Sequence, residues 1–230
     1  MPKIRFGNID FSGDGAYIWG AGQYSAPTRS VDMIEVPGRN GDLIVDNGNY
    51  TNTKAYFDVV ITRDVEKNTD RLKYLLYSQK GYQRLYDSDL KGFYRMASFS
   101  SGFDIMSNDG GVVRIEFDCK PFKYDVLGEN AVVFTDEGNL YNKYFEPSRP
   151  TITVYGSGQG NVYIGNQTIS ISNIDEYVTI DAEMQDAFKG FQNKNATVNT
   201  ADIVLFTGNN NVSFSGGVER VEIKPRWVTI

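Results

Sequence analysis

Five residues near the start of the chain, Pro37, Gly38, Arg39, Asn40 and Gly41, place strict conditions on the backbone. Proline fixes its own φ and donates no N–H, whereas the two glycines can adopt φ > 0. The pair formed by Asn40 and Gly41 is also typical of a tight turn. Because strand-like runs flank this segment at 31–36 and 55–62, the sequence predicts a sharply turned connection there.

Most of the remaining chain alternates between apolar and polar residues, as half-buried strands do. Residues 113–119 show the pattern, and apolar pairs continue it after residue 150: Ile152/Val154, Val162/Ile164, Ile169/Ile171, Val178/Ile180 and Val221/Ile223. Glycine-rich segments such as 156–160, predicted as a hairpin turn, separate the pairs, and long loops are expected at 13–30 and 39–53. The pattern predicts a mostly β protein.

One segment has a helical pattern instead. Residues 64–79 contain no glycine or proline, and Leu72, Leu75 and Leu76 follow helical spacing. Asp64 is in position to be the N-cap, and Gly81 to end the helix. We therefore predict one helix over about 65–79, followed by a hairpin of the strands 82–86 and 93–97 that packs against it.

Composition excludes several classes of function. The 29 acidic residues exceed the 23 basic ones, and both halves of the chain share the excess, so we expect neither sequence-specific nucleic acid binding nor a membrane partner. Histidine is absent, which removes Ser-His-Asp chemistry and most zinc sites. The single cysteine, Cys119, is predicted to be a buried, inert thiol. We expect no enzyme, no catalytic residue, no metal and no cofactor.

The two prolines Pro147 and Pro150 predict a short, stiff connector because they interrupt strand pairing. The chain before them mixes strands with one helix, and the chain after them contains only short strands. We therefore predict an N-terminal domain over residues 1–146 and a C-terminal β-sandwich over residues 147–230.

The segment 37–43, followed by 48–52 and an alternating strand, resembles the N-terminal region of the distal tail (Dit) proteins of long-tailed siphovirus bacteriophages. Further segments occur in the order expected of that domain: 81–85, 93–95 and 119–124. Others resemble the galectin-like domain that follows it in short members of the family: 149–156, 180–183, 208–214 and 223–227. The resemblance covers nearly the whole chain, and it is carried by the ordered set of segments.

The resemblance implies a tail-tube-like β-sandwich with one flanking α-helix, followed by a galectin-like β-sandwich. It also implies a structural hub: a homo-hexameric ring that joins the tail tube to the tail tip and is a docking platform for host-adsorption proteins. The implied partners are the tail-tube, tape-measure and tail-associated tip proteins, and receptor-binding proteins. The implied location is the tail tip of the virion, assembled in the cytoplasm of the host bacterium. The turn residues 37–41 are expected at the ring contact.

Three alternatives remain open. The first is a carbohydrate-binding module contacting the host cell wall. Against it, Trp19 is expected in a glycine-rich loop and Trp227 in a terminal strand, so the two do not suggest one platform. The galectin-type sugar cluster also needs histidine, which this chain lacks. The second is a glycosidase with paired carboxylates, although no spacing selects a pair. The third is the tail-tube protein itself, against which the additional sandwich argues.

Overall fold

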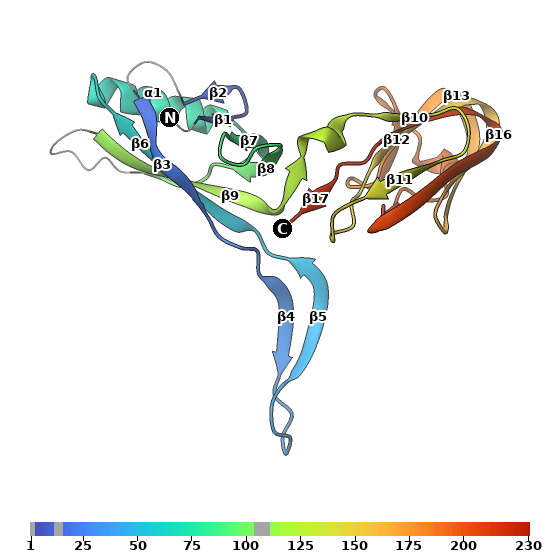
Figure 1. Ribbon diagram of the computed structural model, residues 1–230, viewed down its shortest axis with the longest axis horizontal. Helices are drawn as coiled ribbons and strands as arrows, with labels where there is room; N and C mark the ends of the chain where they lie inside the picture. The colour runs from blue at the N-terminus through green and yellow to red at the C-terminus, as the bar shows by residue number, and fades with distance from the viewer. Residues whose placement is uncertain (1–2, 12–15, 104–110) are drawn as a thin grey trace. The chain divides into compact units, whose positions relative to one another are not determined.

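The computed structural model describes residues 3–11, 16–103 and 111–230, and it consists mainly of β-strands, as predicted (Figure 1). The chain divides into two units. Unit 1 contains Met1–Lys123 and Ile230, and unit 2 contains Tyr124–Thr229. Both are sandwich-like β domains built from curled sheets, and each has its own buried apolar core.

The sheet of unit 1 has the strand order β2-β1-β7-β8-β9-β6-β3. Its strands are β1 (Ile4–Phe6), β2 (Ile9–Asp10), β3 (Ala16–Tyr24), β6 (Thr53–Ile61), β7 (Gln83–Asp87), β8 (Phe93–Ser98) and β9 (Gly111–Asp125). Strand β6 shows why the alternation was a reliable signal, since every second side chain is buried along its whole length. Its partner β9 places Val113, Ile115, Phe117 and Cys119 in the same core, so the predicted burial of Cys119 is confirmed.

The single predicted helix is present as α1 (Val65–Ser78). Thr69, Leu72 and Leu76 are its buried residues, and both leucines belong to the core of unit 1. Asp64 is the N-cap residue as predicted, but it adopts a left-handed conformation and its side chain makes no capping hydrogen bond. The predicted hairpin after the helix is also confirmed. Strands β7 and β8 pair antiparallel, with Gln83 opposite Ala97 and Tyr86 opposite Tyr94.

The sheet of unit 2 has the order β10-β16-β12-β13-β14-β15, and β11 also pairs with β16. Its strands are β10 (Val132–Phe134), β11 (Gly138–Asn142), β12 (Thr151–Ile164), β13 (Gln167–Asp181), β14 (Asp186–Lys189), β15 (Gln192–Asn193) and β16 (Gly208–Lys224). The short strand β17 (Val228–Thr229) pairs with β9 instead. Two short 3-10 helices, η1 (Val126–Glu129) and η2 (Asn195–Thr197), complete the unit. The apolar pairs predicted from the sequence all lie in its core.

The predicted hairpin turn at 156–160 is wrong, because these residues lie inside β12. They form an irregular bend in which the register of β12 shifts against both β13 and β16. A Cβ on Gly217 of β16 would lie 1.7 Å from the carbonyl oxygen of Ser157, so only glycine allows the two backbones to approach so closely. The glycines here therefore bend one long strand. The sequence analysis had interpreted them as a turn between two short strands.

The boundary between the units lies after Lys123 and not after residue 146 as predicted. The reason is strand pairing: β10 and β11 lie before the two prolines, yet both pair with β16 of unit 2. Pro150 directly precedes Thr151, the first residue of β12, a position where the missing N–H is tolerated. The prolines therefore mark the entry to β12 within unit 2.

Candidate assembly surface

The remaining two strands of unit 1, β4 (Arg29–Ile34) and β5 (Leu43–Tyr50), form a separate antiparallel hairpin, here called the arm. Figure 1 shows the arm extending away from the sheet of unit 1. The sequence predicted a strand over 31–36, but it assigned 13–30 and 39–53 to loops. That assignment is wrong, because within the described residues these segments contain β3, part of β4 and β5.

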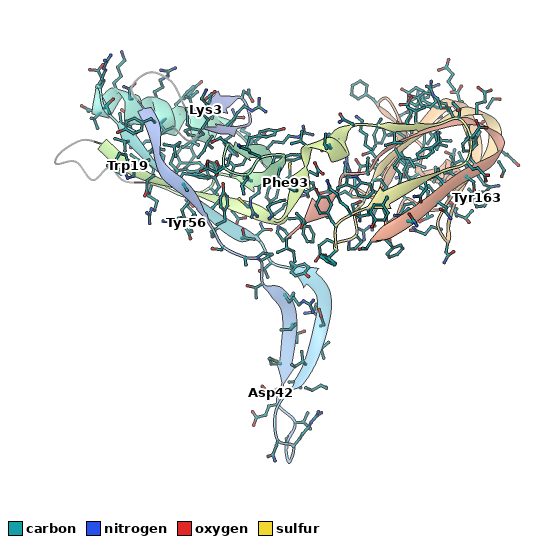
Figure 2. The ribbon with its side chains drawn as sticks, viewed as in Figure 1. Lys3, Trp19, Asp42, Tyr56, Phe93 and Tyr163 are labelled. Atoms are coloured by element: carbon teal, nitrogen blue, oxygen red, sulfur yellow. The ribbon has the colours of Figure 1, made fainter. Side chains whose placement is uncertain are left out.

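The turn motif that opened the sequence analysis forms the tip of the arm, where Figure 2 labels Asp42. The N–H of Arg39 donates to the carbonyl oxygen of Val36 at 3.1 Å. Pro37 occupies the second position of this four-residue turn and Gly38, with φ +81°, the third, which is the type II arrangement. Gly41 also has φ +81°. Both glycines therefore adopt the positive φ that the sequence analysis said they can adopt. Asn40 lies between Arg39, the last residue of the turn, and Gly41.

Both faces of the arm carry exposed, uncovered apolar side chains. Met33 pairs with Ile44 on one face, and Ile34 pairs with Leu43 on the other, since neighbouring residues of a strand point to opposite sides. Met33 and Ile44 are each 60% exposed. The exposed large apolar side chains of the arm and its turn are Val31, Met33, Ile34, Val36, Leu43, Ile44 and Val45. An isolated two-stranded hairpin is marginally stable in water, so such a surface is typical of a contact with another chain.

The base of the arm is held firmly to unit 1. Tyr24, the last residue of β3, donates its hydroxyl to the buried carboxylate of Asp87, and its ring packs edge-on against Phe57 at 5.8 Å. Burial and the acceptor Asp87 raise the pKa of Tyr24. Between the end of β5 and the start of β6, the side-chain amide of Asn52 donates to Asp118 at 2.6 Å. The arm is thus anchored at its base and without cover along its length.

The apolar residues of the arm form the candidate contact surface that the sequence analysis missed. A signal was present, because 31–36 and 43–45 are both rich in large apolar residues and flank the turn symmetrically. The alternation of one buried and one wet face is absent from them, however, and for this reason 43–45 was included in a loop. Residues 37–41 supply the turn that joins the two apolar strands.

Unit 2 has a second uncovered surface, made of aromatic side chains on two neighbouring loops. Phe145 is 95% exposed, and Phe206 is also largely exposed. The loops are joined because Thr207 donates to the carbonyl oxygen of Phe145 at 3.0 Å and Ser148 forms a β-bridge with Leu205. Large exposed aromatic side chains are typical anchors of protein–protein contacts.

The two tryptophans occupy different environments. Trp19 lies in strand β3, not in a loop as predicted, and it is exposed opposite Asp58 of β6. Trp227 packs against the core of unit 2. They belong to different units, Trp19 to unit 1 and Trp227 to unit 2.

Chemistry-bearing residues are dispersed over the described part of the chain. Within residues 3–11, 16–103 and 111–230, no group of three His, Cys, Asp or Glu side chains is placed to hold a metal ion. Burial raises the pKa of the Cys119 thiol to about 12, so it carries almost no thiolate at neutral pH. No described helix is long and apolar enough to cross a membrane.

No protein-family model matches the sequence, and no curated protein does. Solved structures do match. The chain is similar to the SPP1 Dit (gp 19.1) protein, whose structure is presented as a paradigm of the hub adsorption apparatus in phages infecting Gram-positive hosts. The match covers 100% of both chains with a TM-score of 0.74 and 12% identity.

Two structures of the phage P2 baseplate in its activated conformation, one with Ca and one with Sr, match with TM-scores of 0.52 and 0.51. Each match covers 96% of both chains at 12% identity. Identity this low establishes a likeness of fold. Over its whole length, this chain has the fold of a phage distal tail hub protein.

Proposed function

We propose that the protein is a structural hub of a phage tail tip and a component of the virion. In this proposal unit 1 is the tail-tube-like domain and associates with further copies of itself in a closed ring, which the resemblance to Dit proteins makes a hexamer. Unit 2 is the galectin-like domain and contributes the docking platform. The likeness to the SPP1 Dit fold over the full chain supports this reading. No catalytic role is proposed.

The observation that carries the proposal is the arm. A ring subunit must offer one surface to a different surface of its neighbour, and such heterologous contacts close when the rotation permits. The arm presents apolar side chains on both faces and is fixed at its base by Tyr24 and Asn52. We propose that it inserts into the adjacent copy, where burial of these side chains stabilises both the arm and the ring.

The partners in the proposal follow from the position of a hub. The tail-tube and tape-measure proteins contact one side of the ring, and the tail-associated tip protein contacts the other. The aromatic surface around Phe145 and Phe206 is the proposed site for receptor-binding or other host-adsorption proteins.

The test is the mass of the protein by light scattering across a concentration series, with negative-stain images of the heaviest fraction. A six-fold ring with a central hole is the expected assembly. If the protein alone is monomeric, the tail-tube protein is added as a template. Monomers under both conditions would overturn the proposal.

Arm variants make the test specific. The double change Met33→Ser and Ile44→Ser removes one apolar face, and Ile34→Ser with Leu43→Ser removes the other. Each buried apolar side chain contributes about 1.5–3 kcal/mol, so each pair should weaken assembly at least about a hundredfold. Phe191→Ser, a change of a fully exposed side chain in unit 2, is the matched control and should leave ring formation unchanged. Rings formed equally well by both arm variants would exclude the arm as the contact.

A further inference from the structure

An open groove of about 610 Å³ lies on unit 2, beside η2 and on the face of β12, β13 and β16 that points away from the core. The register defines this face. Asn161 pairs with Ser170 on one side and with Ser215 on the other, so the three side chains form a row across three strands. Val162, the next residue of β12, points into the core. The described lining includes no charged residue.

The wall of the groove is held in place by its own hydrogen bonds. The side chain of Asn199 accepts from the N–H of Ser170 at 2.7 Å and donates to the carbonyl oxygen of Thr168 at 3.3 Å. Ser172 donates to the carbonyl oxygen of Thr197 at 3.2 Å. These bonds join the segment around η2 to β13, so the groove is pre-formed.

Asn161 is at the centre of the row, and its side-chain amide makes no hydrogen bond with any residue that the structure describes. An amide offers two N–H donors and a carbonyl oxygen with two lone pairs. The hydroxyl groups of Ser170 and Ser215 lie on either side of it and can each donate and accept. The floor therefore matches a ligand that carries neighbouring hydroxyl groups.

An aromatic ring lies beside this row, next to the lining residue Ser215 but outside the lining itself. Tyr163, which Figure 2 labels in unit 2, follows Asn161 by two residues on β12 and so lies on the same face. Its hydroxyl is 3.3 Å from the hydroxyl of Ser215 and its side chain is only partly buried. An aromatic ring beside neutral hydrogen-bonding groups presents an apolar face and polar partners together.

We propose that this groove binds a neutral saccharide, with Asn161 and Ser170 contacting its hydroxyl groups and Tyr163 stacking on the apolar face of one sugar ring. The inference goes beyond the hub function and stands on different residues. An anionic ligand would need arginine or lysine in the lining, and a protein partner would need large apolar anchors in the groove. The described lining includes no arginine or lysine, and its larger apolar members, Ile171 and Val198, pack in or against the core of unit 2.

The test uses the full-length protein and a panel of neutral oligosaccharides of glucose, galactose, rhamnose and N-acetylglucosamine, with sialylated oligosaccharides as the charged counterpart. Titration calorimetry should show saturable binding of at least one neutral oligosaccharide. Asn161→Ala and Tyr163→Ala should each weaken it about tenfold or more, since a lost hydrogen bond or stacking contact is of that size. Tyr163→Phe keeps the ring and should retain most of the affinity.

Tyr74→Ala is the matched control, since this tyrosine is 75% exposed on the helix of unit 1, and it should not change binding. Thermal melts of all variants exclude unfolding as the cause of a loss. The oligomer mass of Asn161→Ala should equal that of the unaltered protein, which separates this test from that of the hub function. The proposal is overturned if no neutral oligosaccharide saturates the protein, if only charged ones bind, or if Asn161→Ala and Tyr163→Ala bind normally.

Discussion

Arg226 and Asp181 form a two-bond ion pair in unit 2, with Nη1 2.8 Å from Oδ1 and Nη2 2.6 Å from Oδ2. Asp181 ends β13, and its carboxylate also accepts the N–H of Glu183 at 3.0 Å and of Met184 at 3.1 Å. Its side chain is buried. The pair thus links the end of β13 to the loop between β16 and β17, and it satisfies backbone donors as well.

Replacement of this carboxylate should destabilise unit 2 strongly. In Asp181→Asn, the guanidinium of Arg226 stays partly buried and keeps only the longer contact to Glu183, 3.9 Å from Nη1. Loss of one member of a buried ion pair costs about 3–5 kcal/mol. The loss in free energy of unfolding is measured by urea unfolding, followed by the fluorescence of Trp227 in a Trp19→Phe background. Asp202→Asn removes a partner of Arg149 in an exposed pair and should change stability by less than about 1 kcal/mol. Equal losses of stability in Asp181→Asn and Asp202→Asn would contradict a special stabilising role of the buried pair.

The same pair predicts a loss of stability in acid. Burial opposes ionisation of Asp181, but the hydrogen bonds from Arg226 and from the Met184 N–H outweigh it and lower the pKa of the carboxyl in the folded state. A group whose pKa is lower when folded stabilises the fold fully above its unfolded pKa, about 3.9 for aspartate. The contribution disappears as pH falls from about 4 through the lower folded value. The free energy of unfolding, measured at pH 7, 4 and 3, should fall across this range. In Asp181→Asn the fall should be smaller.

Gly38→Ala and Gly41→Ala should impair assembly more than folding. A Cβ at either glycine would meet no atom within 4 Å, so the cost is that of a positive φ alone, about 1–2 kcal/mol in the local turn. The tip contacts no core, so the melting temperature of unit 1 should barely change, while ring formation should weaken. Gly102→Ala, which also meets no atom and has no positive φ, is the control. Variants that form rings as the unaltered protein does would rule out a contact role for the tip.

Arg95 is expected to be dispensable for stability. It is 6% exposed on the core face of β8, opposite Leu85, and its Nε and Nη1 have no hydrogen-bond partner among the described residues. Burial lowers the pKa of this guanidinium, and the ring of Tyr24 lies 5.0 Å from it. Because a buried charge without a full set of partners is costly, Arg95→Met should leave the free energy of unfolding unchanged or raise it.

The comparison for Arg95→Met is Arg84→Met, on the neighbouring strand, where the arginine lies over the ring of Tyr94 at 4.8 Å and is exposed. That change should stay within about 1 kcal/mol. A loss above about 2 kcal/mol for Arg95→Met alone would show that the guanidinium is fully paired in solution.

The bend of β12 predicts an order among glycine substitutions. Gly217→Ala would place its Cβ 1.7 Å from the carbonyl oxygen of Ser157, and backbone must move to relieve the contact. Gly158 has φ +70° but open space around it, so Gly158→Ala costs only about 1–2 kcal/mol. Thermal unfolding of unit 2 should therefore be affected more by Gly217→Ala than by Gly158→Ala, and the reverse order would contradict the role of the bend.

Patterns set by neighbouring residues were predicted correctly from the sequence. The helix over about 65–79, the hairpin of β7 and β8 and the positive φ of Gly38 and Gly41 all follow from short-range rules. The burial of Cys119 follows from the two-residue period of β9. In each case one face of an element is buried, or the turn geometry depends on the residue itself, so local sequence carries the information.

Long-range pairing was decided only by the tertiary structure. The sequence cannot show that β10 and β11, which lie before the prolines, pair with β16, or that the glycines at 156–160 bend one strand rather than end it. The arm lacks a buried and a wet face because apolar side chains are exposed on both of its faces. The groove beside Asn161 exists because three strands and η2 converge there. The sequence determined where the chain can turn and which side chains prefer burial. Which strands meet, and which apolar surfaces stay uncovered, depended on contacts between residues far apart in the chain.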